Sequence, residues 1–177
     1  TSAMPLALQG EAGFAASGTG VRVTEPATAW IATGGADVAR VFRTTDGGMT
    51  WSVAETPLTD ASASSGIFSF VFRDAENGVV VGGDYVHPER AHANAAWTDD
   101  GGVTWIRPEV PPRGYRSGVA WIEGTDTLVC VGPTGTDVST DAGRTWIPLG
   151  DDGYHGVRAV VGGGYASGGS GRLGTLR

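Results

Sequence analysis

The sequence predicts an all-β protein built from four-stranded antiparallel blades, the architecture of a β-propeller. Three observations lead to this fold class. An eight-residue pattern occurs three times, apolar runs with strand-like alternation precede each copy, and no segment shows helical periodicity. We expect three complete blades and a partial fourth, over residues 11–58, 66–110, 115–149 and 154–177, within a single domain that covers 1–177.

The repeated octet has the form Ser/Thr-x-Asp-x-Gly-x-Thr-Trp and predicts a hairpin turn. Its Asp side chain can accept hydrogen bonds from backbone amides just ahead of it, and its Gly suits a positive φ. Thr favours the start of the outgoing strand, and Trp offers a large apolar ring for packing. We therefore assign structural roles to the Asp, Gly and Trp of each octet: Asp46, Gly48, Trp51, Asp100, Gly102, Trp105, Asp141, Gly143 and Trp146.

Strands are expected on both sides of each octet. The runs that precede it are apolar and alternating, and a short strand that ends near a proline follows it. The fourth unit begins at Tyr154 and stops before any octet, so its fourth strand is missing. The N-terminal stretch Met4–Leu8 is a candidate for that strand, which would close a ring by pairing the two chain ends.

Composition excludes several classes of protein. The 30 glycines of 177 residues lack a collagen period and indicate many tight turns. A net charge of -7 without any Lys/Arg run argues against a nucleic-acid partner. No apolar stretch is long enough for a membrane helix, and the lone Cys130 is expected to be a buried strand residue. We expect no cofactor.

The octet resembles the Asp-box, or BNR repeat, of sialidases, sortilin-type receptors and xyloglucan hydrolases. The whole chain also resembles the C-terminal part of bacterial propellers related to photosystem II stability/assembly factors. The segments that carry this second resemblance are 10–19, 42–51, 66–69, 82–85 and 114–118. The resemblance implies a seven-bladed propeller that is periplasmic or extracellular and acts as a scaffold for binding or assembly, without chemistry of its own.

The length departs from that pattern. Seven blades of roughly 45 residues need on the order of 300 residues, more than are present. We therefore expect a part of a larger ring. Two ways of completing it stay open, which are missing N-terminal blades and a homodimer.

A binding site is predicted at one mouth of the channel, where loops lead into the inner strands. The residues proposed for it are Arg116, Tyr115, Asp84, Tyr85 and His155. The partner would be a protein or a glycan. The alternative is structural: Arg116 would form a surface or inter-blade ion pair, and the tyrosines would pack.

The sequence gives little support to two kinds of chemistry. His87 and His92, with Asp84 and Glu89, could approach a metal ion only if an irregular loop happened to converge, so we expect no metal site. A sialidase-like glycoside hydrolase is the alternative function. It would need an arginine triad and a nucleophile pair that the sequence does not supply, although Arg116 and Asp84 are the residues to test.

Overall fold

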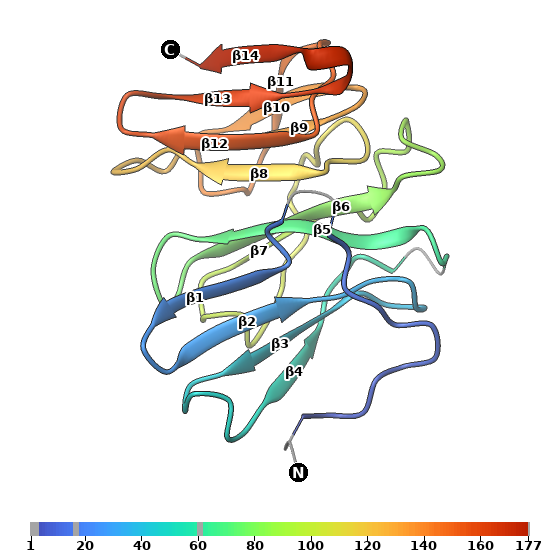
Figure 1. Ribbon diagram of the computed structural model, residues 1–177, viewed down its shortest axis with the longest axis vertical. Coiled ribbons are helices and arrows are strands. Elements are labelled where there is room, and N and C mark those ends of the chain that lie inside the picture. Colours follow the sequence, from blue (N-terminus) through green and yellow to red (C-terminus); the bar gives the residue numbers. More distant parts are fainter. Residues whose placement is uncertain (1–3, 16–17, 60–61, 177) are drawn as a thin grey trace.

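The computed structural model describes residues 4–15, 18–59 and 62–176, and these form four antiparallel sheets stacked one after another (Figure 1). Blade 1 has four strands, β1 (Val21–Glu25), β2 (Thr28–Ala32), β3 (Arg40–Thr44) and β4 (Ser52–Glu55). Blade 2 has three strands, β5 (Ser65–Phe72), β6 (Gly78–Asp84) and β7 (Ala95–Thr98). Blade 3 has four, β8 (Gly118–Trp121), β9 (Leu128–Gly132), β10 (Gly135–Ser139) and β11 (Ile147–Gly150), and blade 4 has three, β12 (Gly156–Val160), β13 (Gly163–Ser167) and β14 (Leu173–Leu176).

The all-β prediction is confirmed. One short 3-10 turn, Gly169–Gly171, is the helical element of the described residues. No helix of this part of the chain has the length and apolar character to cross a bilayer.

Blade 2 differs from its predicted four strands. The strand expected after Trp105 is reduced to one antiparallel bridge between Ile106 and Trp97. Pro108 follows two residues later and has no N–H to donate, so the ladder cannot extend in that direction.

The three octets fold into the same turn, which follows the third strand of blades 1, 2 and 3. In the first, Asp46 Oδ1 accepts hydrogen bonds from Thr44 Oγ1 at 2.8 Å and from the Thr50 amide at 2.9 Å. The same two bonds, at the same two distances, reach Asp100 and Asp141. These carboxylates serve the turn, as the sequence predicts.

Three apolar cores hold the molecule together, and each lies between two neighbouring blades. Trp105 packs with Trp30 and Phe72, so the octet tryptophan of blade 2 faces blade 1. Trp146 of blade 3 packs in the same way with Val79 and Val81 of blade 2. Cys130 is fully buried in this second core, as predicted, and burial strongly raises the pKa of its thiol.

The first strands of the four blades lie side by side along one face of the stack. Contacts join β1 to β5, β5 to β8 and β8 to β12. We call these four the inner strands. The two chain ends lie at opposite ends of the stack, and the Leu6 carbonyl accepts a hydrogen bond from Arg40 of blade 1 (Figure 1). Within one chain, Met4–Leu8 is therefore not the fourth strand of blade 4.

Candidate binding site on the inner strands

Three of the five residues predicted to bind a ligand lie together at one mouth of the stack. Tyr85 and Tyr115 both pack edge-on against Phe68, with ring centroids 5.9 Å and 4.8 Å away. Asp84 precedes Tyr85 and is buried. Tyr85 is about half exposed (52%), so the polar rim of this aromatic cluster reaches solvent.

The Asp84 carboxylate is already occupied by hydrogen bonds. It accepts from Ser64 Oγ at 2.7 Å and from the Val86 amide at 2.9 Å, and it lies 2.7 Å from His87 Nδ1. Burial alone would raise the pKa of Asp84, but these hydrogen bonds outweigh it and lower the pKa to about 2. Asp84 therefore acts as a charged anchor for its loop.

Arg116 is turned into the protein. Its guanidinium is fully buried and forms an ion pair with Asp137, to which Nε donates at 2.7 Å. Nη1 donates to the Tyr115 carbonyl and to Thr134 Oγ1. Arg116 thus forms an ion pair, as the structural alternative predicts. The pair is buried inside blade 3, however, and is neither on the surface nor between blades.

His155 is exposed, and its described contacts lead away from the aromatic cluster. Its carbonyl accepts from Ser117 Oγ, and its amide donates to the Ser167 carbonyl. The structure thus groups Asp84, Tyr85 and Tyr115, and it places Arg116 and His155 in separate surroundings.

Metal ligation finds no geometric support in the described residues. No group of three or more His, Cys, Asp or Glu side chains gathers within 4–15, 18–59 and 62–176. The contact between His87 and Asp84 is a pair only.

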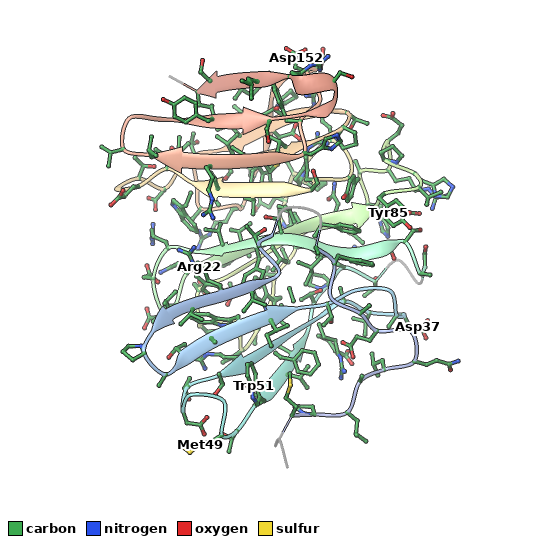
Figure 2. The ribbon with its side chains drawn as sticks, in the orientation of Figure 1. Arg22, Asp37, Met49, Trp51, Tyr85 and Asp152 are labelled. Atoms are coloured by element: carbon green, nitrogen blue, oxygen red, sulfur yellow. The ribbon has the colours of Figure 1, made fainter. Side chains whose placement is uncertain are left out.

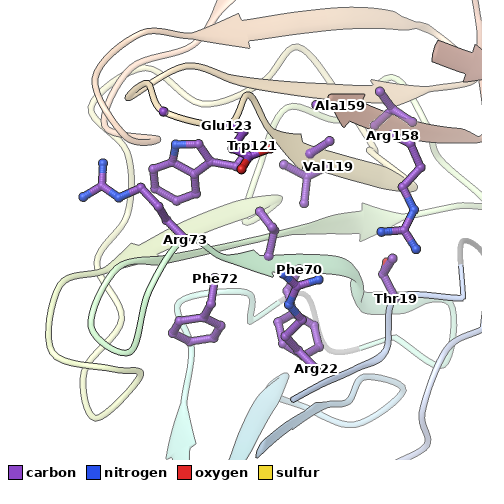
Figure 3. A pocket seen from close by; sticks show the side chains of 14 residues that line it. Thr19, Arg22, Phe70, Phe72, Arg73, Val119, Trp121, Glu123, Arg158 and Ala159 are labelled. Atoms are coloured by element: carbon purple, nitrogen blue, oxygen red, sulfur yellow. The ribbon is translucent and has the colours of Figure 1, made fainter. Parts of the chain in front are cut away.

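A cavity of about 430 Å³ opens along the inner strands of all four blades (Figure 3). Its apolar lining includes Phe70, Val119 and Trp121, and Thr19 and Ala159 lie at its side. The lining takes consecutive residues of each inner strand, such as Phe70, Val71 and Phe72, so these strands border the cavity along their length. The cavity borders the inner strands of four successive blades, so it suits an extended ligand.

Three arginines line this cavity, and in Figure 3 they stand around its rim. Arg73 lies over the Trp121 ring at 4.9 Å and pairs with Asp74 and Asp126. Arg22 Nε is buried and has no hydrogen-bond partner among the described residues. Arg158 is exposed on β12. Glu123 is the one carboxylate among the lining residues, and Asp74 and Asp126 offset the charge of Arg73, so Arg22 and Arg158 leave the lining a small excess of positive charge.

Sequence reasoning missed this cavity, although it identified the strands that build it. A partial signal was present on β12, where the exposed Arg158 follows the buried Val157, whereas on β1 the apolar Val21 and Val23 are more exposed than Arg22 between them. That signal becomes readable only when the strands are aligned on their blades, because each strand alone is too short to show which face is buried.

Comparison with solved structures decides the architecture. A structure of YCF48 bound to D1 peptide superposes with a TM-score of 0.61 at 20% identity, and it covers 94% of this chain and 52% of that one. The fold is that of a β-propeller. The GH74 xyloglucanase from Xanthomonas campestris superposes with a TM-score of 0.52 at 17% identity, and the match covers 77% of this chain and 23% of that one. The GH74 enzyme from Niastella koreensis superposes with a TM-score of 0.53 at 16% identity, and the match covers 84% of this chain and 23% of that one.

This propeller chain spans about half the length of the YCF48 chain it matches. No family model and no curated protein matches it. The inner strands with their cavity accordingly correspond to the channel side of a propeller.

Proposed function

We propose that the chain is a non-catalytic propeller that binds an extended segment of another protein along its inner strands. The observation that carries this proposal is the cavity lined by all four inner strands, with Arg22, Arg73 and Arg158 at its rim in a chain of net charge -7. Scattered acidic groups elsewhere repel an acidic ligand, so a local cluster of guanidinium groups directs it to this place.

The chemistry of the lining indicates what kind of segment fits. Guanidinium groups form paired hydrogen bonds with carboxylates, so Asp or Glu side chains or a C-terminal carboxylate match Arg22 and Arg158. Phe70, Val119 and Trp121 are 2%, 4% and 9% exposed, so they back the cavity with little free surface, and we expect ligand contacts mainly at the arginines. The peptide bound to YCF48, and the resemblance of the octets to Asp-box repeats of assembly-factor-like propellers, support a protein partner.

A carbohydrate ligand is the second candidate, favoured by the two GH74 neighbours. Hydrolysis of a glycoside uses two carboxyl groups that flank the bond. The described cavity lining contributes one, Glu123. Asp84 and Glu89 do not belong to this lining, and the Asp84 carboxylate already accepts hydrogen bonds from Ser64 and Val86. These placements favour binding over hydrolysis.

We also propose that the protein works in the periplasm or outside the cell, in keeping with the resemblance to exported propellers. Fractionation of the source cells tests this. Recovery of the protein only with the cytoplasm would contradict it.

Titration of labelled peptides tests the function. We expect an acidic peptide library to bind more tightly than its lysine counterpart, and the double change Arg22→Ala and Arg158→Ala to weaken binding at least tenfold. Arg144→Ala is the control, because Arg144 stacks on Trp97 away from the cavity. Equal binding by the double variant would refute the site. Release of reducing sugar from xyloglucan by the unaltered chain would favour the second candidate.

A further inference from the structure

The outer edge of β7 in blade 2 has a gap beside Ala95. Backbone hydrogen bonds alternate between the two sides of a strand, and the Asn94 carbonyl accepts from the Gly82 amide of β6. The next residue, Ala95, therefore directs its N–H and C=O groups away from β6, as Trp97 does. Trp97 uses these groups in its bridge with Ile106, whereas no hydrogen bond reaches those of Ala95 from the part of the chain that the structure describes.

The path of the chain explains this gap. In the register of that bridge, Pro108 comes opposite Ala95, and it has no N–H to donate. The chain then turns to blade 3, where the Glu109 amide donates to the Arg144 carbonyl at 2.8 Å. On the other side, Ala93 has a φ of 49°, in the left-handed region, which breaks the strand geometry there. Blades 2 and 3 each have a neighbour on both sides, so the gap is a feature of the blades themselves.

A cavity of about 140 Å³ lies at the gap. Residues 91–95 line one side of it, and Arg107, Pro108 and Pro111 line the other. Ala95 is 3% exposed and its methyl group belongs to the apolar core between blades 2 and 3, so we infer that it borders the cavity with its main chain. The space is several times the share of about 30 Å³ that one water molecule takes in the liquid. It therefore admits a guest larger than a single water.

Asn94 supplies a second unpaired group at the same place. The side chain is 1% exposed, and its Nδ2 donates to the Pro112 and Gly114 carbonyls, each at 2.8 Å. Its Oδ1 is buried and has no hydrogen-bond partner among the described residues. Buried polar groups in folded proteins nearly always have a partner. Two neighbouring acceptors, this oxygen and the Ala95 carbonyl, thus lack a donor beside the cavity.

The rim of the cavity carries positive charge. Arg107 and His92 are both exposed and border it from different segments. Arg107 Nη2 donates to the Pro57 carbonyl at 3.0 Å, and within the described residues its guanidinium pairs with no carboxylate. The lining residues include no Asp or Glu. A guanidinium group in this setting favours a carboxylate as its partner.

We propose that this cavity binds a carboxylate with a neighbouring amide, which is the chemistry of an N-acylated amino acid or of the last residue of a peptide. The amide N–H of the ligand donates to the Ala95 carbonyl, and a ligand oxygen accepts from the Ala95 N–H. Arg107 and His92 hold the carboxylate. One residue fits and a longer strand does not, because Ile106 and Ala93 close the edge on its two sides. The site is separate from the inner strands and does not depend on ligand binding there.

Nuclear magnetic resonance titration with N-acetyl-L-alanine tests the site. We expect a saturable shift of the Ala95 amide resonance. N-acetyl-L-alanine amide lacks the charge and acetate lacks the amide, so each should bind at least about tenfold more weakly. N-acetyl-Gly-Gly-Ala distinguishes the two sources: tighter binding than N-acetyl-L-alanine identifies a peptide end, and equal binding identifies the small molecule. No shift at Ala95 with any of these compounds would mean that the cavity holds water only, and it overturns the proposal.

Substitution of Arg107 tests the contact with the carboxylate. Arg107→Gln should weaken binding of N-acetyl-L-alanine at least about tenfold, and Arg107→Lys, which keeps the charge, should weaken it less. Arg172→Gln is the matched control, because Arg172 is an exposed arginine of blade 4, and it should leave the affinity unchanged. Unaltered binding by Arg107→Gln, or shifts confined to inner-strand residues such as Phe70 and Val119, would assign the ligand to another place and overturn the proposal.

The position of this site on the molecule differs from that of the octet at the first blade. Figure 2 labels Met49 and Trp51 of that octet near one end of the stack and Tyr85 near its middle, beside the end of β6. Because β7 pairs with β6, the proposed site belongs to the middle of the stack.

Discussion

Arg116 shows how burial changes the role of a single residue. Its side chain lies wholly inside the protein against Asp137, which also accepts from Arg113 Nε at 3.0 Å. A buried ion pair contributes little net free energy while intact, but removal of one partner leaves an uncompensated charge. The arginine is thus a stability residue, and its place in the loop before an inner strand is a poor guide to ligand contact.

Arg116→Ala should lower the free energy of unfolding by about 3–5 kcal/mol, because Asp137 would lose its best-buried partner. Urea titration measures the loss. Arg144→Ala, on the surface over Trp97, should change it by less than about 1 kcal/mol. A variant with unaltered unfolding and impaired peptide binding would instead restore Arg116 to the binding site.

The octet carboxylates predict a loss of stability in acid. Hydrogen bonds from the Thr50 side chain and amide lower the pKa of Asp46 to about 2. Burial would raise the pKa of Asp100, but hydrogen bonds from Thr104 and Thr98 outweigh it and lower the pKa to about 2. Each folded pKa lies below the unfolded value of about 3.9, so the contribution is complete above pH 4.

Unfolding free energy should therefore fall as pH drops from about 4 to about 2. Urea titrations across that range measure the slope, and Asp100→Asn should reduce both the stability at pH 7 and the slope. An identical slope in Asp100→Asn would show that the octet hydrogen bonds do not survive in solution.

At the scale of the element, the octet turn joins hairpin geometry to packing between blades. Its aspartate fixes the turn, and its tryptophan then fills the space toward the preceding blade, as Trp146 does with 2% exposure. One short segment thus determines both a strand pairing within a blade and the contact between two blades.

Trp146→Ala should cost about 3–5 kcal/mol, and Trp51→Ala distinctly less, because Trp51 keeps part of its surface in water. Urea titration of the two variants measures both costs. Equal costs would mean that the preceding blade does not determine the burial of the indole.

The strands could be predicted from the sequence because the apolar runs, the octets and the glycine positions all indicated the same strands and turns. Apolar runs marked β5 and β9, the octets marked the turns, and glycine marked positions of positive φ such as Gly48 at 89°. The fourth strand of blade 2 was predicted but is reduced to one bridge at Ile106, because Pro108 stops the ladder in a segment that otherwise has the pattern of a strand.

At the scale of the whole molecule, the site was only partly predictable. The loop cluster of Asp84, Tyr85 and Tyr115 followed from the expectation that loops at one mouth meet. The orientation of Arg116 and the cavity with Arg22 and Arg158 depend on how four blades are placed around one axis. That placement is set by contacts between residues far apart in the chain, which no local pattern records.

The three apolar cores all lie at junctions between consecutive blades, and none belongs to one blade alone. A blade excised by itself would therefore keep its hydrogen-bonded ladder but lose the surface that makes folding favourable. Adding or removing one entire unit would leave the remaining junctions nearly as they were, whereas a cut through the middle of a unit would damage two at once. Duplication of whole units is thus the physically inexpensive route by which such a chain lengthens or shortens.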